Sequence, residues 1–187
     1  MILIYTDGSC LSNPGPGGFG VIMRWKDKEI KISEGFRNTT NNRMELLGPI
    51  TALKKLKNPQ NILITTDSRY VIDGIEKGWA KKWQKNNWMR DKKNKALNSD
   101  LWDRLLDLCE FHQKIEFVWV KGHKGHAENE LCDLLAKDAA SSDSLLIDEN
   151  FEKIKKAAES TTSHGKLLRV DQYPIQNFVV LDFILDT

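Results

Sequence analysis

Two aspartates follow short apolar segments that have the composition of buried strands. Asp7 comes directly after residues 2–6 (ILIYT), and Asp67 comes directly after residues 62–66 (ILITT). We expect each carboxylate to lie at the carboxyl end of its strand, which is the edge where open sheets bind ligands. If the two strands are parallel neighbours, the like charges repel each other unless a proton or a cation lies between them. The pair therefore predicts a site for a divalent metal ion.

The ligand type indicates which metal and which reaction such a site would support. Hard oxygen ligands without a Cys/His cluster favour Mg²⁺ or Mn²⁺ over Zn²⁺. Two such ions, roughly 3.5–4 Å apart, stabilise both the attacking and the leaving oxygen of a phosphodiester, which is nuclease chemistry. The alternative for each residue alone is structural, because Asp7 or Asp67 could simply cap the turn or helix that follows it.

Two further acidic residues have ambiguous positions. Glu45 stands three residues after Asn42, which is also the spacing of a helix capping box. Asp133 lies in a predicted helix beside three leucines, where an aspartate is usually just solvated. Either residue becomes a candidate ligand only in combination with the two strand-end aspartates.

Hydrophobic periodicity predicts the elements that must position these residues. Extended segments are expected at residues 2–6, 18–25, 29–36, 62–66 and 115–120. Helices are expected at residues 42–56, in short stretches up to about residue 85, at 99–112 and at 128–140. Strands followed by alternating helices and strands imply an α/β fold in which helices cover a mixed sheet.

The composition is that of an ordinary globular protein. The chain has 187 residues, 40% of them hydrophobic and 29% charged, so we expect one domain at residues 1–142 and an appendage at residues 143–187. No apolar run approaches the roughly 18 residues that span a bilayer, and no secretion signal is recognisable, which indicates a cytoplasmic protein. The net charge is only +2, but residues 77–95 hold eight basic residues and one acidic residue. Such a local basic patch is typical of nucleic-acid binding.

Four ordered motifs carry a resemblance to a known family. They are TDGSC at residues 6–10 with NPGPGG at 13–18, TTNNRMEL at 39–46, TDSRY at 66–70 and VKGHKGHAENELCD at 120–133. In this order and at this spacing they closely resemble the type 1 ribonuclease H family, over about residues 1–140. The resemblance implies a five-stranded mixed sheet flanked by helices.

The resemblance also implies an activity and its ligands. The family hydrolyses the RNA strand of RNA–DNA hybrids and leaves 5′-phosphate and 3′-hydroxyl ends, with metal held by four carboxylates that match Asp7, Glu45, Asp67 and Asp133. Mg²⁺ is the implied ion, with Mn²⁺ as a substitute. His123 matches a mobile histidine that assists proton movement or product release. The alternative for His123-x-x-His126 is a polar loop or a zinc site, but no Cys/His pair accompanies it.

Further positions match contacts to the hybrid. RNA is distinguished from DNA by its 2′-hydroxyls, which short polar side chains and backbone groups recognise. The matching positions are Gly8, Asn13, Asn41 and Asn42, with Thr40 for a DNA-strand phosphate and, in the basic stretch, Trp79, Lys81, Lys82 and Lys85. The alternative is that these lysines only solvate a helix, and we expect Trp83 and Trp88 to pack inward.

Two departures from the family pattern affect these expectations. Gly48-Pro49 lies inside the helix that carries Glu45, and the proline ring clashes with the carbonyl four residues earlier, so the helix should bend or restart. Arg69 follows Asp67-Ser68 where a shorter amide side chain is common, which puts one RNA contact in doubt.

The appendage lies outside the resemblance. A helix is expected at residues 149–159, followed by an apolar finish that we expect to pack on the domain or on a symmetry mate. The spacing of Gln172, Ile175 and Phe178 loosely resembles a sliding-clamp-binding peptide, which would make the tail a weak protein-binding site on a monomer. Two other functions stay open: a non-catalytic hybrid-binding module, and an integrase- or resolvase-like DNA nuclease.

Overall fold

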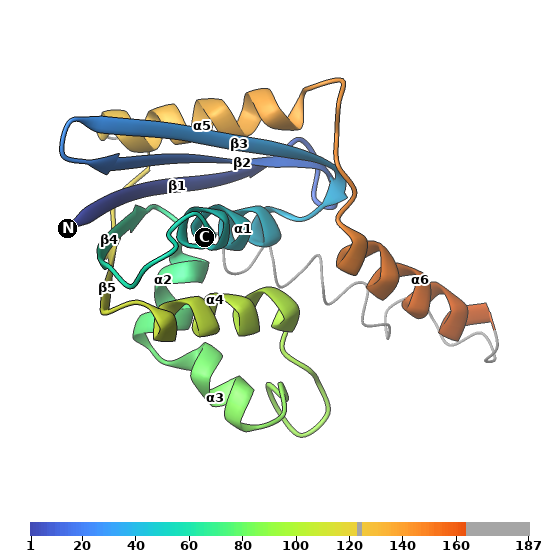
Figure 1. Ribbon diagram of the computed structural model, residues 1–187. Helices are drawn as coiled ribbons and strands as arrows, with labels where there is room; N and C mark the ends of the chain where they lie inside the picture. The colour runs from blue at the N-terminus through green and yellow to red at the C-terminus, as the bar shows by residue number, and fades with distance from the viewer. Residues whose placement is uncertain (123–124, 164–187) are drawn as a thin grey trace.

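Five strands form one mixed sheet with the spatial order β3-β2-β1-β4-β5. The computed structural model describes residues 1–122 and 125–163 (Figure 1). The strands are β1 (Ile2–Cys10), β2 (Gly15–Trp25), β3 (Lys28–Thr39), β4 (Asn61–Thr66) and β5 (Lys114–Trp119). β1, β2 and β3 are antiparallel neighbours, whereas β4 and β5 run parallel to β1. The predicted fold class is confirmed.

Helices cover both faces of this sheet. They are α1 (Asn41–Lys54), α2 (Arg69–Glu76), α3 (Trp79–Lys85), α4 (Ser99–Phe111), α5 (Ala127–Ala140) and α6 (Glu149–Ser163). α5 packs on one face, over β1, β2 and β3, while α1 packs on the other face and is itself covered by α4 (Figure 1). The bounds of α1, α4 and α5 agree with the predicted helices to within about two residues at each end, and α2 and α3 lie where short helical stretches were expected.

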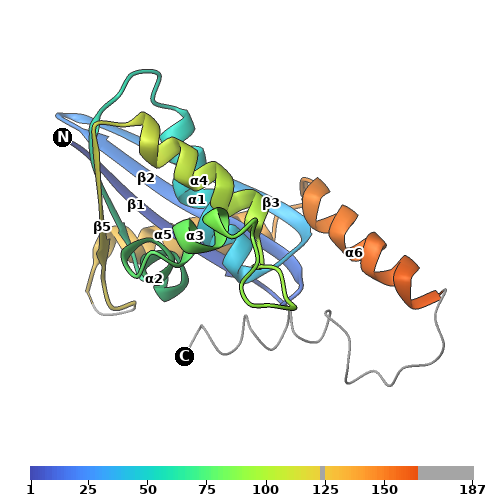
Figure 2. The ribbon, with the colours of Figure 1, turned by 90° about the horizontal axis from the view of Figure 1, so that it is seen from below.

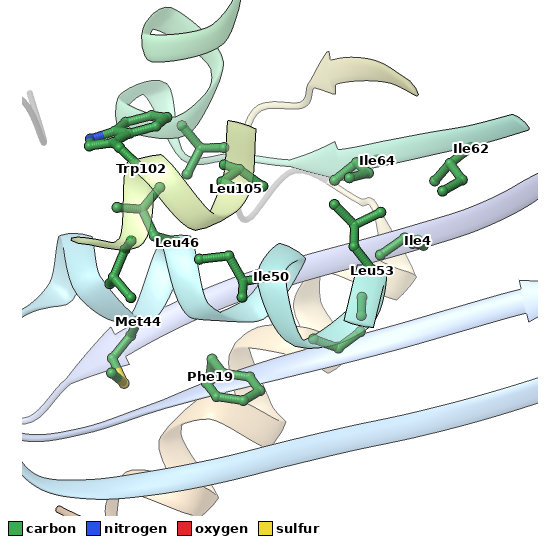
Figure 3. Close-up of a cluster of buried hydrophobic side chains, with 14 of the residues drawn as sticks. Ile4, Phe19, Met44, Leu46, Ile50, Leu53, Ile62, Ile64, Trp102 and Leu105 are labelled. Carbon is green, nitrogen blue, oxygen red and sulfur yellow. The ribbon is translucent and has the colours of Figure 1, made fainter. Parts of the chain in front are cut away.

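The hydrophobic core lies between α1 and the sheet. Leu46, Ile50 and Leu53 recur at helical spacing along α1 and are at most 1% exposed. They face apolar strand residues such as Ile4 and, from α4, the fully buried Trp102 (Figure 3). This packing holds α1 in a fixed position against β1, and α1 carries Glu45.

The structure decides two open points about α1. The helix continues from Asn41 to Lys54 with Pro49 inside it, so it does not restart at the proline. The buried apolar side holds the helix to the sheet and offsets the backbone bond that proline removes. The residue before the helix is Thr40, and Asn42 lies in its first turn, so Asn42 and Glu45 do not form a capping box.

The segment after α5 is attached to the edge of the sheet. Leu146 donates its N–H to the Gly35 carbonyl at 2.8 Å and accepts from the Arg37 N–H at 3.0 Å, which forms one parallel β-bridge to the edge strand β3. α6 then starts at Glu149 and points away from the sheet and from α1 in both views (Figures 1 and 2). Its predicted start is confirmed, and it runs further than residue 159. The expectations for residues 164–187, including the clamp-binding spacing, lie outside the described residues.

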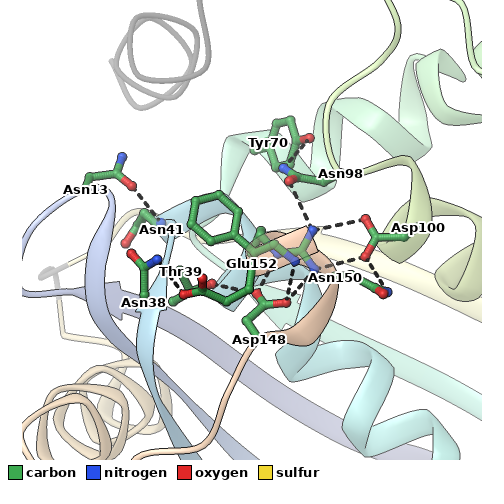
Figure 4. A network of polar contacts seen from close by, with 12 residues as sticks. Asn13, Asn38, Thr39, Asn41, Tyr70, Asn98, Asp100, Asp148, Asn150 and Glu152 are labelled. Carbon is green, nitrogen blue, oxygen red and sulfur yellow. Dashed lines mark hydrogen bonds and ion pairs between the residues drawn. The ribbon is translucent and has the colours of Figure 1, made fainter. Parts of the chain in front are cut away.

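A buried ion-pair network connects that segment to the first turn of α1. Arg43 is 1% exposed and donates from Nε and Nη2 to Asp148 at 2.6 and 2.9 Å, and from Nη1 and Nη2 to Asp100 at 3.0 and 2.9 Å (Figure 4). Asp148 also accepts from the Thr39 hydroxyl at 2.9 Å. Burial lowers the pKa of Arg43, but its bonds to Asp100 and Asp148 outweigh burial and raise that pKa above the ordinary value. Residue 148 is therefore packed against the body of the protein, which is formed by the sheet and helices α1 to α5.

Candidate active site

Asp7 and Asp67 lie at the same edge of the sheet. β1 pairs with β4 only as far as Tyr5 opposite Thr65, but it continues against β2 to Cys10. Asp7 is therefore inside β1, so the prediction that the strand ends before Asp7 is wrong, because β2 prolongs the strand after β4 has ended. Asp67 follows β4 directly, as predicted.

Burial and neighbouring charges act together on Asp7. Asp7 is buried, with only 8% of its surface exposed. Burial raises the pKa of Asp7 well above its ordinary value, and the negative charges of Asp67 and Asp133 raise it further, against a lowering effect of the hydrogen bond that the Gly8 N–H donates at 2.7 Å. The three carboxylates are thus close enough to repel one another, which is the arrangement that a bound cation relieves.

Asp133 reaches this edge because α5 packs very closely on the sheet. Gly20 is paired with Asp7 across β1 and β2, and a Cβ atom at Gly20 would overlap with the Cys132 carbonyl. The absence of a side chain at Gly20 lets the residue before Asp133 lie directly on the strand beside Asp7. The Asp133 carboxylate forms an ion pair with Lys137 at 2.7 Å, one helical turn later.

Glu45 enters from the opposite face. It is 8% exposed and accepts hydrogen bonds from the Ser68 hydroxyl at 2.5 Å and from the Asn41 side chain at 3.1 Å. A Cβ atom at Gly8 would overlap with the backbone N of Glu45, so α1 contacts β1 directly beside Asp7. Sequence reasoning missed Ser68, although its place at the start of α2, where its hydroxyl accepts from the Val71 N–H, was a detectable capping signal.

The four carboxylates come from separate parts of the fold: Asp7 from β1, Glu45 from α1, Asp133 from α5, and Asp67 from the residue after β4. All four would bind a metal ion through oxygen atoms. Within residues 1–122 and 125–163, no three acidic, histidine or cysteine side chains are already arranged as a metal site. Glu45 bonds to Ser68 and Asn41, and Asp133 bonds to Lys137. The donor chemistry fits a hard divalent cation, and the raised pKa of Asp7 marks the negative charge that this cation would neutralise.

The predicted hybrid contacts form two groups. Gly8 and Asn41 contact Glu45, and the Asn13 side chain accepts from the Asn41 N–H at 3.1 Å. Thr40 and Asn42 flank Asn41 and are buried, 4% and 1% exposed. In the second group Lys81, Lys82 and Lys85 are exposed on α3. Trp79 stacks on Trp83 with 6.4 Å between ring centroids, and Trp83 and Trp88 pack against the core as expected. His123 lies outside the described residues.

Comparison with known proteins identifies the family. The model of the RNase H family matches residues 1–141. The chain belongs to the RNase H family. Its curated relatives include the Ribonuclease H of Desulforamulus reducens, 59% identical over 147 residues (79% of this chain, 92% of the relative), and the Ribonuclease HI of Synechocystis sp., 50% identical over 153 residues (81% and 95%).

Solved structures agree with this family assignment. LC9-RNase H1, described as a type 1 RNase H with the type 2 active-site motif, superposes with a TM-score of 0.68 at 30% identity and covers 89% of this chain and 86% of its own. LC11-RNase H1, solved in complex with an RNA/DNA hybrid, has a TM-score of 0.57 at 22% identity and shares the fold. No helix in the described part of this RNase H is long and apolar enough to cross a membrane.

Gly122 limits the space around one carboxylate of this RNase H. A Cβ atom at Gly122 would overlap with Oδ2 of Asp67. If Asp67 is a metal ligand, a displaced carboxylate binds the metal less well, and Gly122→Ala should weaken the apparent Mg²⁺ affinity in hybrid cleavage by roughly 10–100-fold. A Mg²⁺ titration of cleavage measures this, and excess Mg²⁺ should recover part of the rate. An unchanged titration curve would mean that Asp67 does not need this space.

Proposed function

We propose that this chain is a divalent-metal-dependent endonuclease that hydrolyses the RNA strand of RNA–DNA hybrids. The observation that carries the proposal is the buried Asp7, whose pKa is raised by burial and by the carboxylates of Asp67 and Asp133. Structural carboxylates are usually paired with cations or exposed to water, so a cluster of this kind indicates a functional site. The membership of the RNase H family and the names of its relatives support the same reaction.

We propose Asp7, Glu45, Asp67 and Asp133 as the ligands of Mg²⁺, with Mn²⁺ as a substitute. When bound, a pair of such ions supplies an activated water and stabilises the departing 3′ oxygen, which leaves a 5′-phosphate. The chain's own groups orient the ligands: the Gly8 N–H holds Asp7, and the Ser68 hydroxyl and the Asn41 amide hold Glu45.

Substrate recognition divides between the two groups of predicted contacts. The short polar side chains of Asn13, Asn41 and Asn42 and the backbone at Gly8 suit the 2′-hydroxyls of the RNA strand. Thr40, Trp79 and the lysines of α3 suit phosphates, which position the hybrid without reading its sequence. We assign proton movement or product release to His123. The cytoplasmic location, the monomeric state and a partner for the tail stay predictions.

A parallel cleavage assay tests the proposal. The full chain is incubated with an RNA–DNA hybrid, duplex DNA and duplex RNA of one sequence, each with Mg²⁺ and with EDTA. We expect cleavage of the hybrid alone, on the RNA strand, only with Mg²⁺, and with 5′-phosphate ends. Hybrid binding without cleavage would support a binding module, and cleavage of duplex DNA would support an integrase-like nuclease; either result would overturn the proposal.

A further inference from the structure

Arg69 holds its positive charge beside the carboxylate cluster in a defined position. It is the first residue of α2, two residues after Asp67, and it is exposed. Its guanidinium carbon lies 3.5 Å from the centroid of the Trp119 ring. A guanidinium at this distance stacks on the aromatic face, which is favourable for arginine in particular because its cation is planar and weakly hydrated.

Trp119 is itself fixed to the site. It is the last residue of β5, paired with Thr66 at the end of β4, and its indole Nε1 donates to the backbone carbonyl of Asp67 at 2.9 Å. The indole therefore has a defined orientation relative to Asp67. Because Arg69 stacks on that indole, its guanidinium is held in place before any ligand arrives, and less side-chain entropy is lost when a ligand binds.

The charge of Arg69 is not neutralised by the protein. In the described part of the chain Arg69 forms no ion pair, although it lies two residues from Asp67. By contrast, Lys137, which also lies near the cluster, forms an ion pair with Asp133. The guanidinium contacts the Trp119 ring and pairs with no carboxylate of the described residues, so its N–H donors are available to a ligand.

We propose that Arg69, held on Trp119, binds a phosphate of the RNA strand next to the one that is cleaved. A planar guanidinium with free N–H edges matches the oxygens of a phosphate. Because Trp119 is bonded to the Asp67 backbone, a strand whose scissile phosphate faces Asp67 would bring a neighbouring phosphate toward Arg69. Arg69 would then contribute affinity and alignment and take no part in the hydrolytic step. This inference rests on the proposed hybrid cleavage.

The test is the salt dependence of KM in two matched variants of the full chain. Arg69→Gln removes the proposed contact. Lys114→Gln removes the same charge at the other end of β5, roughly 16 Å from Trp119 at the rise of an extended strand. For Arg69→Gln we expect a KM about tenfold higher at low salt, a kcat within about twofold, and a slope of log KM against log salt that is smaller by about one. Lys114→Gln should match the wild type in all three.

Two further variants separate the effect of the Arg69 charge from the effect of its stacking on Trp119. Arg69→Lys keeps the charge without the planar stack, and Trp119→Phe keeps an aromatic face without the bond to Asp67, so both should give intermediate KM values. The inference is overturned if Arg69→Gln keeps the wild-type KM and slope, or if it changes which sequences are cleaved while the slope stays constant, which would indicate a base contact. Failure of the wild type to cleave hybrids would instead remove the proposed function.

Discussion

Asp7→Asn is expected to abolish hybrid cleavage and at the same time to stabilise the metal-free protein. The amide removes a proposed metal ligand, and the loss of metal-assisted stabilisation should lower kcat at least about a thousandfold. The free energy of unfolding of the metal-free protein should rise, because burial and the charges of Asp67 and Asp133 disfavour the ionised Asp7 carboxylate. Asparagine has nearly the same shape and carries no charge, so this penalty disappears.

The sign of the pH dependence follows from the raised pKa of Asp7. The folded protein binds this proton more tightly than the unfolded chain does, so the free energy of unfolding falls as pH rises from the unfolded pKa of about 3.9 through the folded value. At pH values above the folded pKa of Asp7, the metal-free wild type bears the whole free-energy cost of the buried, ionised Asp7 carboxylate. Asp7→Asn should therefore be more stable at pH 7 by on the order of 1 kcal/mol, or about 2–4 °C in Tm.

Thermal melts with EDTA and with Mg²⁺ measure this effect. The wild type should gain stability when Mg²⁺ is added, because a ligand that binds only the folded state stabilises it, and Asp7→Asn should gain much less. Asp138→Asn makes the same chemical change at an exposed position of α5 and should alter neither Tm nor cleavage. A metal-free Asp7→Asn that melts below the wild type would contradict the electrostatic description of the site.

Asp148→Ala is expected to destabilise the protein by about 3–5 kcal/mol, because it leaves a buried cation without one of its two partners. Arg43 donates two hydrogen bonds to Asp148 and is 1% exposed, so water cannot replace the carboxylate. The substitution also removes the acceptor of the Thr39 hydroxyl. The Tm should fall by about 10 °C.

Glu149→Ala is the matched control for that change. Glu149 is the neighbouring residue, and its ion pair with Lys153 at 3.7 Å joins two side chains that are 77% and 73% exposed. Surface pairs of this kind contribute little, so its Tm should stay within about 2 °C of the wild type. Equal effects of the two substitutions in thermal melts would show that the buried network does not hold residues 145–152 to the body.

Local sequence pattern was sufficient for most of the elements and for two of the four candidate ligands. The apolar positions of α1, with Leu46, Ile50 and Leu53 at helical spacing, predicted the helix and its buried side, because helical periodicity is a property of neighbouring residues. Asp7 and Asp67 were candidates because each follows an apolar segment. The joint occurrence of the family motifs then added Glu45 and Asp133, which no local pattern distinguishes from ordinary surface acids.

Contacts between distant segments were decided by the tertiary structure alone. β1 extends past Asp7 because β2 pairs with it there, and α1 continues through Pro49 because its buried side is held against the sheet. Asp148 is 105 residues from Arg43 along the chain, and the stack of Arg69 on Trp119 joins α2 to β5. Such pairs leave no periodic signal, since their energies depend on the register and packing that bring the segments together.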